Sequence, residues 1–188
     1  MIEHDPDADL LPRIGRGDQS AIREMVARKL PRLLALAVRM LNDRAEAEDI
    51  TQETFMRIWK QAPRWQTGKA KFDTWMHRVA LNLCYDRLRT RQDHGEDDMP
   101  EQIDATKTPE QYLTGLQQRD QVAEALAALP IRQREALVLQ YYQEISNAEA
   151  AGLMEISIDA LESLLSRARR NMRTTLLLRG FERKTHDT

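Results

Sequence analysis

Apolar residues recur at intervals of three or four along most of the chain, and no stretch alternates strictly between apolar and polar residues. This spacing predicts amphipathic helices and no strands. A helix over about residues 45–61 shows the pattern most clearly, because its apolar positions share one face and its polar positions share the other. The apolar positions of that helix are Ala47, Ile50, Thr54, Phe55, Ile58 and Trp59.

Capping residues and prolines predict where the helices begin and end. Asp18 is suited to cap a first helix. Pro31 is expected to break that helix or to start the next one, because proline lacks the backbone N–H of a helix interior. Asn42 and Asp43 predict a turn. Further helices are expected over about residues 45–61, 72–91, 132–142 and 157–178, with one ending at Pro130 and a short one opened by Ser146 and Glu149 as a capping box.

One segment breaks the helical pattern and divides the chain. Residues 92–112 lack periodicity, contain Gly95, Pro100 and Pro109, and are rich in acids. Such a composition is typical of a flexible linker. We therefore expect an all-α fold of two small helical domains, residues 1–91 and 113–188, joined by this acidic linker.

Charge is distributed unevenly along the chain. The formal net charge is only −2. Residues 57–91 and 163–184 are nevertheless strongly basic, on either side of the acidic linker. Basic segments are typical of surfaces that contact nucleic-acid phosphates. The near-neutral average therefore conceals two candidate phosphate-binding surfaces.

Composition also narrows the possible functions. No apolar run approaches the ~20 residues of a membrane span, and the acidic N-terminus lacks the apolar core of a secretory signal. Cys84 is the only cysteine, so we expect an ordinary thiol and a protein of the cytoplasm. The histidines show no zinc spacing with it, and no phosphate-binding glycine loop is present. The sequence predicts no metal, no cofactor, no small-molecule substrate, no membrane insertion and no enzyme.

Two helices carry candidate binding surfaces. The polar face of the 45–61 helix holds Asp49, Gln52 and Glu53, which form either a solvated face or a docking surface for another protein. The 72–91 helix combines basic residues with aromatic ones, a combination that suits single-stranded nucleic acid. Trp75 is expected in the core, whereas Trp65, in the preceding loop, belongs either to the core or to a base-binding surface.

The C-terminal part predicts a helix-turn-helix. A short helix over residues 147–154 is followed by a turn at 155–157 and a long helix from Ile158. Taken alone, two helices around a turn also fit an ordinary helical hairpin.

Three segments, in this order, resemble those of the extracytoplasmic-function sigma factors, which belong to the sigma-70 family. The first is similar to the polymerase-binding signature of sigma region two, the second to its promoter-melting segment and the third to the start of sigma region four. They are residues 49–59 (DITQETFMRIW), 72–89 (FDTWMHRVALNLCYDRLR) and 129–135 (LPIRQRE).

The resemblance implies a sigma factor that binds core RNA polymerase through its beta-prime and beta subunits, recognises and melts promoter DNA, and is controlled by an anti-sigma factor. It implies that Asp49, Gln52 and Glu53 meet the beta-prime clamp helices. The minus-ten strand is expected on Trp65, Lys69, Lys71, Arg78, Asn82, Arg87 and Arg89. The minus-thirty-five duplex is expected on Ser157, Asp159, Glu162, Ser163, Ser166, Arg167 and Arg170. The linker is either a tether or a segment that threads near the polymerase active centre.

Glu162 and Leu164 depart from the family pattern, in which these exposed positions are usually basic or polar. Glu162 repels phosphate but can accept a hydrogen bond from a cytosine amino group, and Leu164 either touches a thymine methyl or packs in the core. Two other functions stay open. One is a sigma-mimicking decoy that sequesters an anti-sigma factor, and the other is a plain helix-turn-helix regulator, which has no need of the acidic face.

Overall fold

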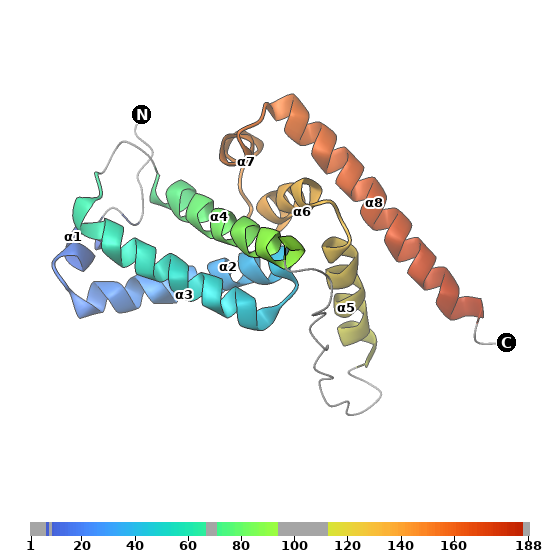
Figure 1. Ribbon diagram of the computed structural model, residues 1–188, viewed down its shortest axis with the longest axis horizontal. Helices are drawn as coiled ribbons and strands as arrows, with labels where there is room; N and C mark the ends of the chain where they lie inside the picture. The colour runs from blue at the N-terminus through green and yellow to red at the C-terminus, as the bar shows by residue number, and fades with distance from the viewer. Residues whose placement is uncertain (1–6, 8, 67–70, 94–112, 186–188) are drawn as a thin grey trace.

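The computed structural model describes residues 7, 9–66, 71–93 and 113–185 (Figure 1). Over these residues the chain is helical and contains no strand, as the spacing predicts. Within the same residues, no helix combines the length and the apolar composition that crossing a bilayer requires.

The chain forms two groups of helices, on either side of residues 94–112. In the N-terminal half they are α1 (Leu10–Gly15), α2 (Gln19–Leu41), α3 (Arg44–Gln61), the 3₁₀ turn η1 (Ala62–Arg64) and α4 (Phe72–Asp93). In the C-terminal half they are α5 (Leu113–Ala127), α6 (Ile131–Leu137), the π-helical turn η2 (Val138–Tyr142), α7 (Asn147–Met154) and α8 (Ile158–Thr185).

The predicted caps are confirmed by hydrogen bonds. The Asp18 carboxylate accepts from the backbone N–H of Ser20 at 2.8 Å, which fixes the start of α2. The Ser146 hydroxyl accepts from the Glu149 backbone at 3.3 Å and donates to its carboxylate at 3.0 Å, closing the first turn of α7. Asn42 ends α2 in the left-handed region at φ 52°, where asparagine is tolerated.

The expected break at Pro31 is wrong, because α2 runs unbroken through this proline. Met25 and Leu33, on either side of it, are both fully buried in the same core. The burial of α2 on both sides of the proline outweighs the hydrogen bond that proline removes. The last helix also continues to Thr185, beyond the predicted end near residue 178.

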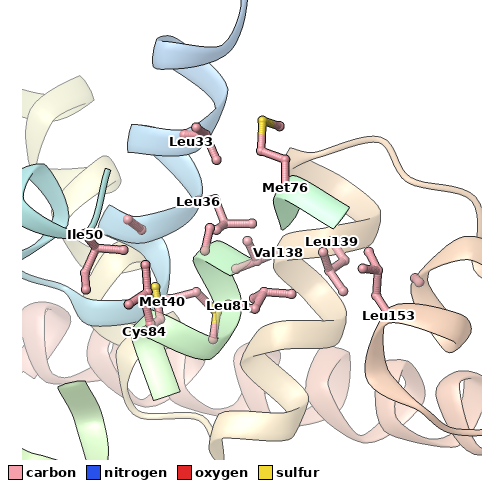
Figure 2. Close-up of a cluster of buried hydrophobic side chains, with 14 of the residues drawn as sticks. Leu33, Leu36, Met40, Ile50, Met76, Leu81, Cys84, Val138, Leu139 and Leu153 are labelled. Atoms are coloured by element: carbon pink, nitrogen blue, oxygen red, sulfur yellow. The ribbon is translucent and has the colours of Figure 1, made fainter. Parts of the chain in front are cut away.

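The two halves share one hydrophobic core. Figure 2 shows Leu36 and Met40 of α2 and Leu81 of α4 facing Val138 and Leu139 of η2. All five side chains are buried. Residues more than fifty positions apart in the sequence therefore pack in the same water-free core. Each half covers apolar surface that the other half would otherwise expose to solvent.

Buried polar groups cross the same joint. Arg134, only 9% exposed, donates to the backbone carbonyl of Met40 in α2 and to that of Ala127 at the end of α5. Burial and the charge of Arg91 lower the pKa of Arg134. Because a buried cation without acceptors is strongly destabilising, these carbonyls fix the position of α6 on α2.

A substitution in one half is therefore expected to destabilise the other. Leu139→Ala is expected to lower the free energy of unfolding by about 2–5 kcal/mol, because Leu139 is fully buried. All three tryptophans lie in the N-terminal half, so their fluorescence during urea unfolding reports on that half. The control Leu177→Ala, at a side chain 63% exposed, is expected to change stability by no more than about 0.5 kcal/mol. An unchanged tryptophan transition in Leu139→Ala would contradict a shared core.

Candidate nucleic-acid interface

The polar face of α3 lies in solvent. Asp49 and Gln52 are exposed, and Glu53 is partly exposed and pairs with Arg57 at 2.9 Å. On the opposite side Ile50 and Ile58 are buried in the core, as the helical spacing predicts. The three predicted polymerase-contacting residues therefore share an accessible helical surface.

An aromatic cluster stands where the chain enters α4. The Trp65 ring lies 5.5 Å from the Phe72 ring in an edge-on arrangement and 5.6 Å from the Trp75 ring. Phe72 is buried, and both tryptophans are partly buried against the core. The cluster anchors the N-terminus of α4, and Trp65 is a partly exposed residue whose indole nitrogen is buried.

The residue before α4 and the first half of that helix present basic and polar groups towards α7. The Lys71 ammonium lies 2.9 Å from the Glu149 carboxylate, and Arg78 donates to the Gly152 carbonyl at 3.3 Å. Asn82 is exposed and lines a cavity of ≈ 260 Å³ together with Met154. Three of the predicted minus-ten residues are thus brought together, and they face the C-terminal half.

The other predicted minus-ten residues lie further along α4 or outside the described residues. Arg87 approaches Glu46 of α3 at 3.5 Å, and Arg89 pairs with Asp86 at 2.7 Å on the exposed side of the helix. Lys69 lies outside the described residues. The basic face of α4 therefore extends beyond the part that α7 contacts.

Polar residues that lie in the family-like segments, but have no predicted binding role, hold α4 against the C-terminal half. The Tyr85 hydroxyl donates to the Glu135 carboxylate at 2.5 Å, and Arg132 reaches the same carboxylate at 2.9 Å. Arg132 also donates to the Met154 carbonyl at 2.7 Å. Burial raises the pKa of Glu135, and burial together with the hydrogen bond to Glu135 raises that of Tyr85. The sequence signal for this network is the carboxyl group of Glu135, which stands directly before the buried apolar run of residues 136–139.

The C-terminal half forms the predicted helix-turn-helix. Glu155 ends α7 at φ 55°, and Ser157 accepts from the Ala160 backbone at 3.1 Å to start α8. Leu164 is partly buried and packs against the core, which favours the packing alternative. The predicted minus-thirty-five residues are all exposed. Six of them line one open hollow on the surface of α8: Asp159, Glu162, Ser163, Ser166, Arg167 and Arg170.

The chain matches two family models, Sigma-70 region 2 over residues 25–94 and Sigma-70 region 4 over residues 119–172. It is similar to the ECF RNA polymerase sigma factor SigW of Bacillus subtilis, with 29% identity over 177 residues, 88% of this chain and 94% of that protein.

Two solved structures have a similar fold. The first is CnrH in complex with the cytosolic domain of CnrY, with a TM-score of 0.68, 25% identity and coverage of 90% of this chain and 96% of that one. The second is the sigma factor RpoE in complex with the anti-sigma factor NepR from Bartonella quintana, with a TM-score of 0.65, 27% identity and coverage of 82% and 95%.

The buried thiol of Cys84, on the core side of α4, gives a testable prediction. Burial raises the pKa of its thiol to about 12, so at pH 8 only about one molecule in 10⁴ carries the reactive thiolate. We expect the folded chain to react with a thiol reagent far more slowly than Met56→Cys, which places a thiol at a side chain 59% exposed. Urea is expected to remove the difference. Equal rates in the folded protein would contradict the burial of Cys84.

Proposed function

Because the chain belongs to the sigma-70 family as an extracytoplasmic-function sigma factor, we propose that it directs core RNA polymerase to a particular set of promoters and opens the duplex there. It acts in the cytoplasm as a binding protein without catalytic residues or a cofactor of its own. An anti-sigma factor holds it inactive until transcription is needed.

The order of the two matched regions carries this proposal. Region 2 spans the helices with the acidic polymerase-facing surface and the basic face of α4, and region 4 spans the helix-turn-helix. A plain helix-turn-helix regulator has no use for the first region. A protein that joins both can contact polymerase and two promoter elements at once.

Promoter opening needs no nucleophile. It needs a cationic surface for the phosphates of the displaced strand and a place for unstacked bases. Lys71 and Arg78 supply the cations and Asn82 supplies amide hydrogen bonds, next to the aromatic cluster of Trp65. We assign the minus-ten strand to this surface and the minus-thirty-five duplex to the exposed face of α8.

The two structural relatives support control by an anti-sigma factor. RpoE is described with an anti-sigma factor, and CnrH with the cytosolic domain of CnrY. We propose that this chain is likewise held by a protein partner. Glu162, an exposed acid on the DNA-facing side of α8, favours a second candidate function, a decoy that occupies an anti-sigma factor without using DNA.

We expect Asp49→Lys to weaken binding to core polymerase by about tenfold or more, since like charges brought together at an interface cost several kcal/mol. Its control is Glu24→Lys, which makes the same charge change at a partly exposed position of α2, where Glu24 pairs with Arg28 as Glu53 does with Arg57 on α3. Affinity for labelled core enzyme is measured for both, with helicity by circular dichroism. If Asp49→Lys binds core enzyme as tightly as the wild type does, α3 is not part of the polymerase interface.

At the minus-thirty-five element, Arg167→Ala is expected to weaken binding to all duplexes alike and to reduce the salt slope by about one. Glu162→Arg is expected to strengthen binding and to change the preferred base at one position, where a direct contact is worth about 1–3 kcal/mol.

Selection from randomised duplexes at fixed salt measures both effects. Arg16→Ala, an exposed arginine of the N-terminal half, controls for overall charge. No enrichment with any variant, together with normal initiation from a native promoter, would show that α8 does not recognise this element.

A further inference from the structure

The connection between α3 and α4 carries two groups of the proposed minus-ten surface, Trp65 near its start and Lys71 at its end. Where these side chains point depends on how the η1 turn and the first turn of α4 are held. Residues 7 and 9–15, on the N-terminal side of α2, are linked to both turns. They precede residues 25–94, which match Sigma-70 region 2, and no binding role is predicted for them.

On one side, α1 holds the η1 turn. The two elements pack together, and Figure 1 shows α1 at the end of the N-terminal half that is remote from α8. A Cβ atom on Gly15 would lie only 2.9 Å from the Cα of Pro63, so the two backbones approach as closely as glycine allows. Ile14 of α1 and Ala62 of η1 are both buried in the core. The position of Trp65, directly after η1, therefore depends on that of α1.

On the other side, a buried cation ties the same segment to the start of α4. The backbone carbonyl of Asp7 accepts from the Leu10 N–H at 3.0 Å, which joins Asp7 to α1. The Lys29 ammonium lies 2.5 Å from the Asp7 carboxylate and 2.5 Å from that of Asp73, in the first turn of α4. The side chains of Lys29 and Asp7 are only 8% and 1% exposed. Because a buried charge that loses its partner is strongly destabilising, these two residues fix each other.

The pairing of Lys29 with Asp73 has a different effect. The Asp73 side chain is 37% exposed and keeps access to water, so this ion pair adds orientation rather than much stability. Asp73 directly follows Phe72, whose ring lies 5.8 Å from that of Trp75, and Trp75 in turn contacts Trp65. Lys71 stands two positions earlier. A rotation of this first turn would therefore move the aromatic cluster and the Lys71 ammonium together.

We propose that residues 7 and 9–15 form an N-terminal clasp that positions the minus-ten surface, with Lys29 as its positioning residue. The inference rests on the proposed function and adds the residues that orient the strand-binding side chains. Asp7 and Lys29 contact no strand themselves. The clasp holds both ends of the connection between α3 and α4, through Gly15 at η1 and through Lys29 at the first turn of α4.

The test replaces Lys29 by an uncharged side chain of similar length. In reconstituted holoenzyme, Lys29→Met is expected to weaken binding of a single-stranded oligonucleotide with the minus-ten element of a native promoter by about fivefold or more, the value of one base-stacking contact. Affinity for core polymerase is expected to stay at the wild-type value. The matched control is Arg23→Met, which removes a cation at an exposed position of the same helix, where Arg23 donates to the Gln19 carbonyl. It is expected to leave both affinities unchanged.

A double variant separates positioning from stability. Lys29→Met takes the nearer of two cations from the Asp7 carboxylate, since Arg28 lies 3.5 Å away, and is expected to lower the urea midpoint measured by circular dichroism. Adding Asp7→Asn removes the buried negative charge, so we expect the midpoint to recover. The oligonucleotide affinity is expected to stay low, because Asp73 still lacks its tie to the clasp.

Gly15→Ala tests the other side of the clasp and decides the matter if Lys29→Met does not fold. Its methyl group would press on Pro63 and displace η1. We expect weaker binding of the oligonucleotide and unchanged affinity for core polymerase.

Wild-type oligonucleotide affinity in folded Lys29→Met would overturn the clasp. Recovery of both stability and oligonucleotide affinity in the double variant, or an equal loss of core affinity, would also overturn it, because these residues would then act through stability alone. Arg78→Ala, a change within the proposed surface itself, identifies a deeper failure. If it too binds the oligonucleotide as the wild type does, the minus-ten assignment is wrong and the clasp has no surface to position.

Discussion

The arrangement of the whole molecule depends on how buried polar groups are satisfied at the joint between its halves. Arg134, Glu135 and Gln143 come from the C-terminal half and are nearly inaccessible to water. Their partners include the Met40 carbonyl, the Tyr85 hydroxyl and the Arg32 carbonyl of the other half. A hydrogen bond adds little net stability, but an unpaired buried group costs several times more. The joint therefore fixes one relative position of the two halves. Sliding one half along the other would leave a buried cation or carboxyl group without a hydrogen-bond partner.

The sequence separation of the interacting residues determines which features can be predicted from the sequence. The helix caps at Asp18 and Ser146, the polar face of α3 and the helix-turn-helix all follow from local pattern, because their causes lie within one or two turns. The joint has no such signal. Arg134 and Met40 are 94 positions apart, and Gln143 and Arg32 are 111 apart. Nothing in the spacing of either residue indicates the other.

The same distinction accounts for the individual errors and omissions. Pro31 predicts a break from local chemistry, yet the shared core buries α2 on both sides of it. The sequence allows Leu164 either a base contact or a place in the core, and its packing against the core cluster favours the second. The sequence predicts no contact between Tyr85 and Glu135, because an isolated tyrosine or glutamate on a helix is ordinary. They become notable only where the fold removes both from water.

The three proposed binding surfaces differ in how they relate to the opposite half of the chain. The acidic face of α3 and the proposed minus-thirty-five face of α8 are exposed and make no contact with the opposite half that is described above, whereas the exposed residues Lys71 and Arg78 contact α7. A promoter strand that binds Lys71 and Arg78 therefore has to replace their contacts with Glu149 and the Gly152 carbonyl. An exposed ion pair contributes at most about 1 kcal/mol, so displacing Glu149 from Lys71 costs a bound strand little. The proposed minus-ten surface thus differs from the other two because Lys71 and Arg78 serve both the contact with α7 and the proposed contact with the strand.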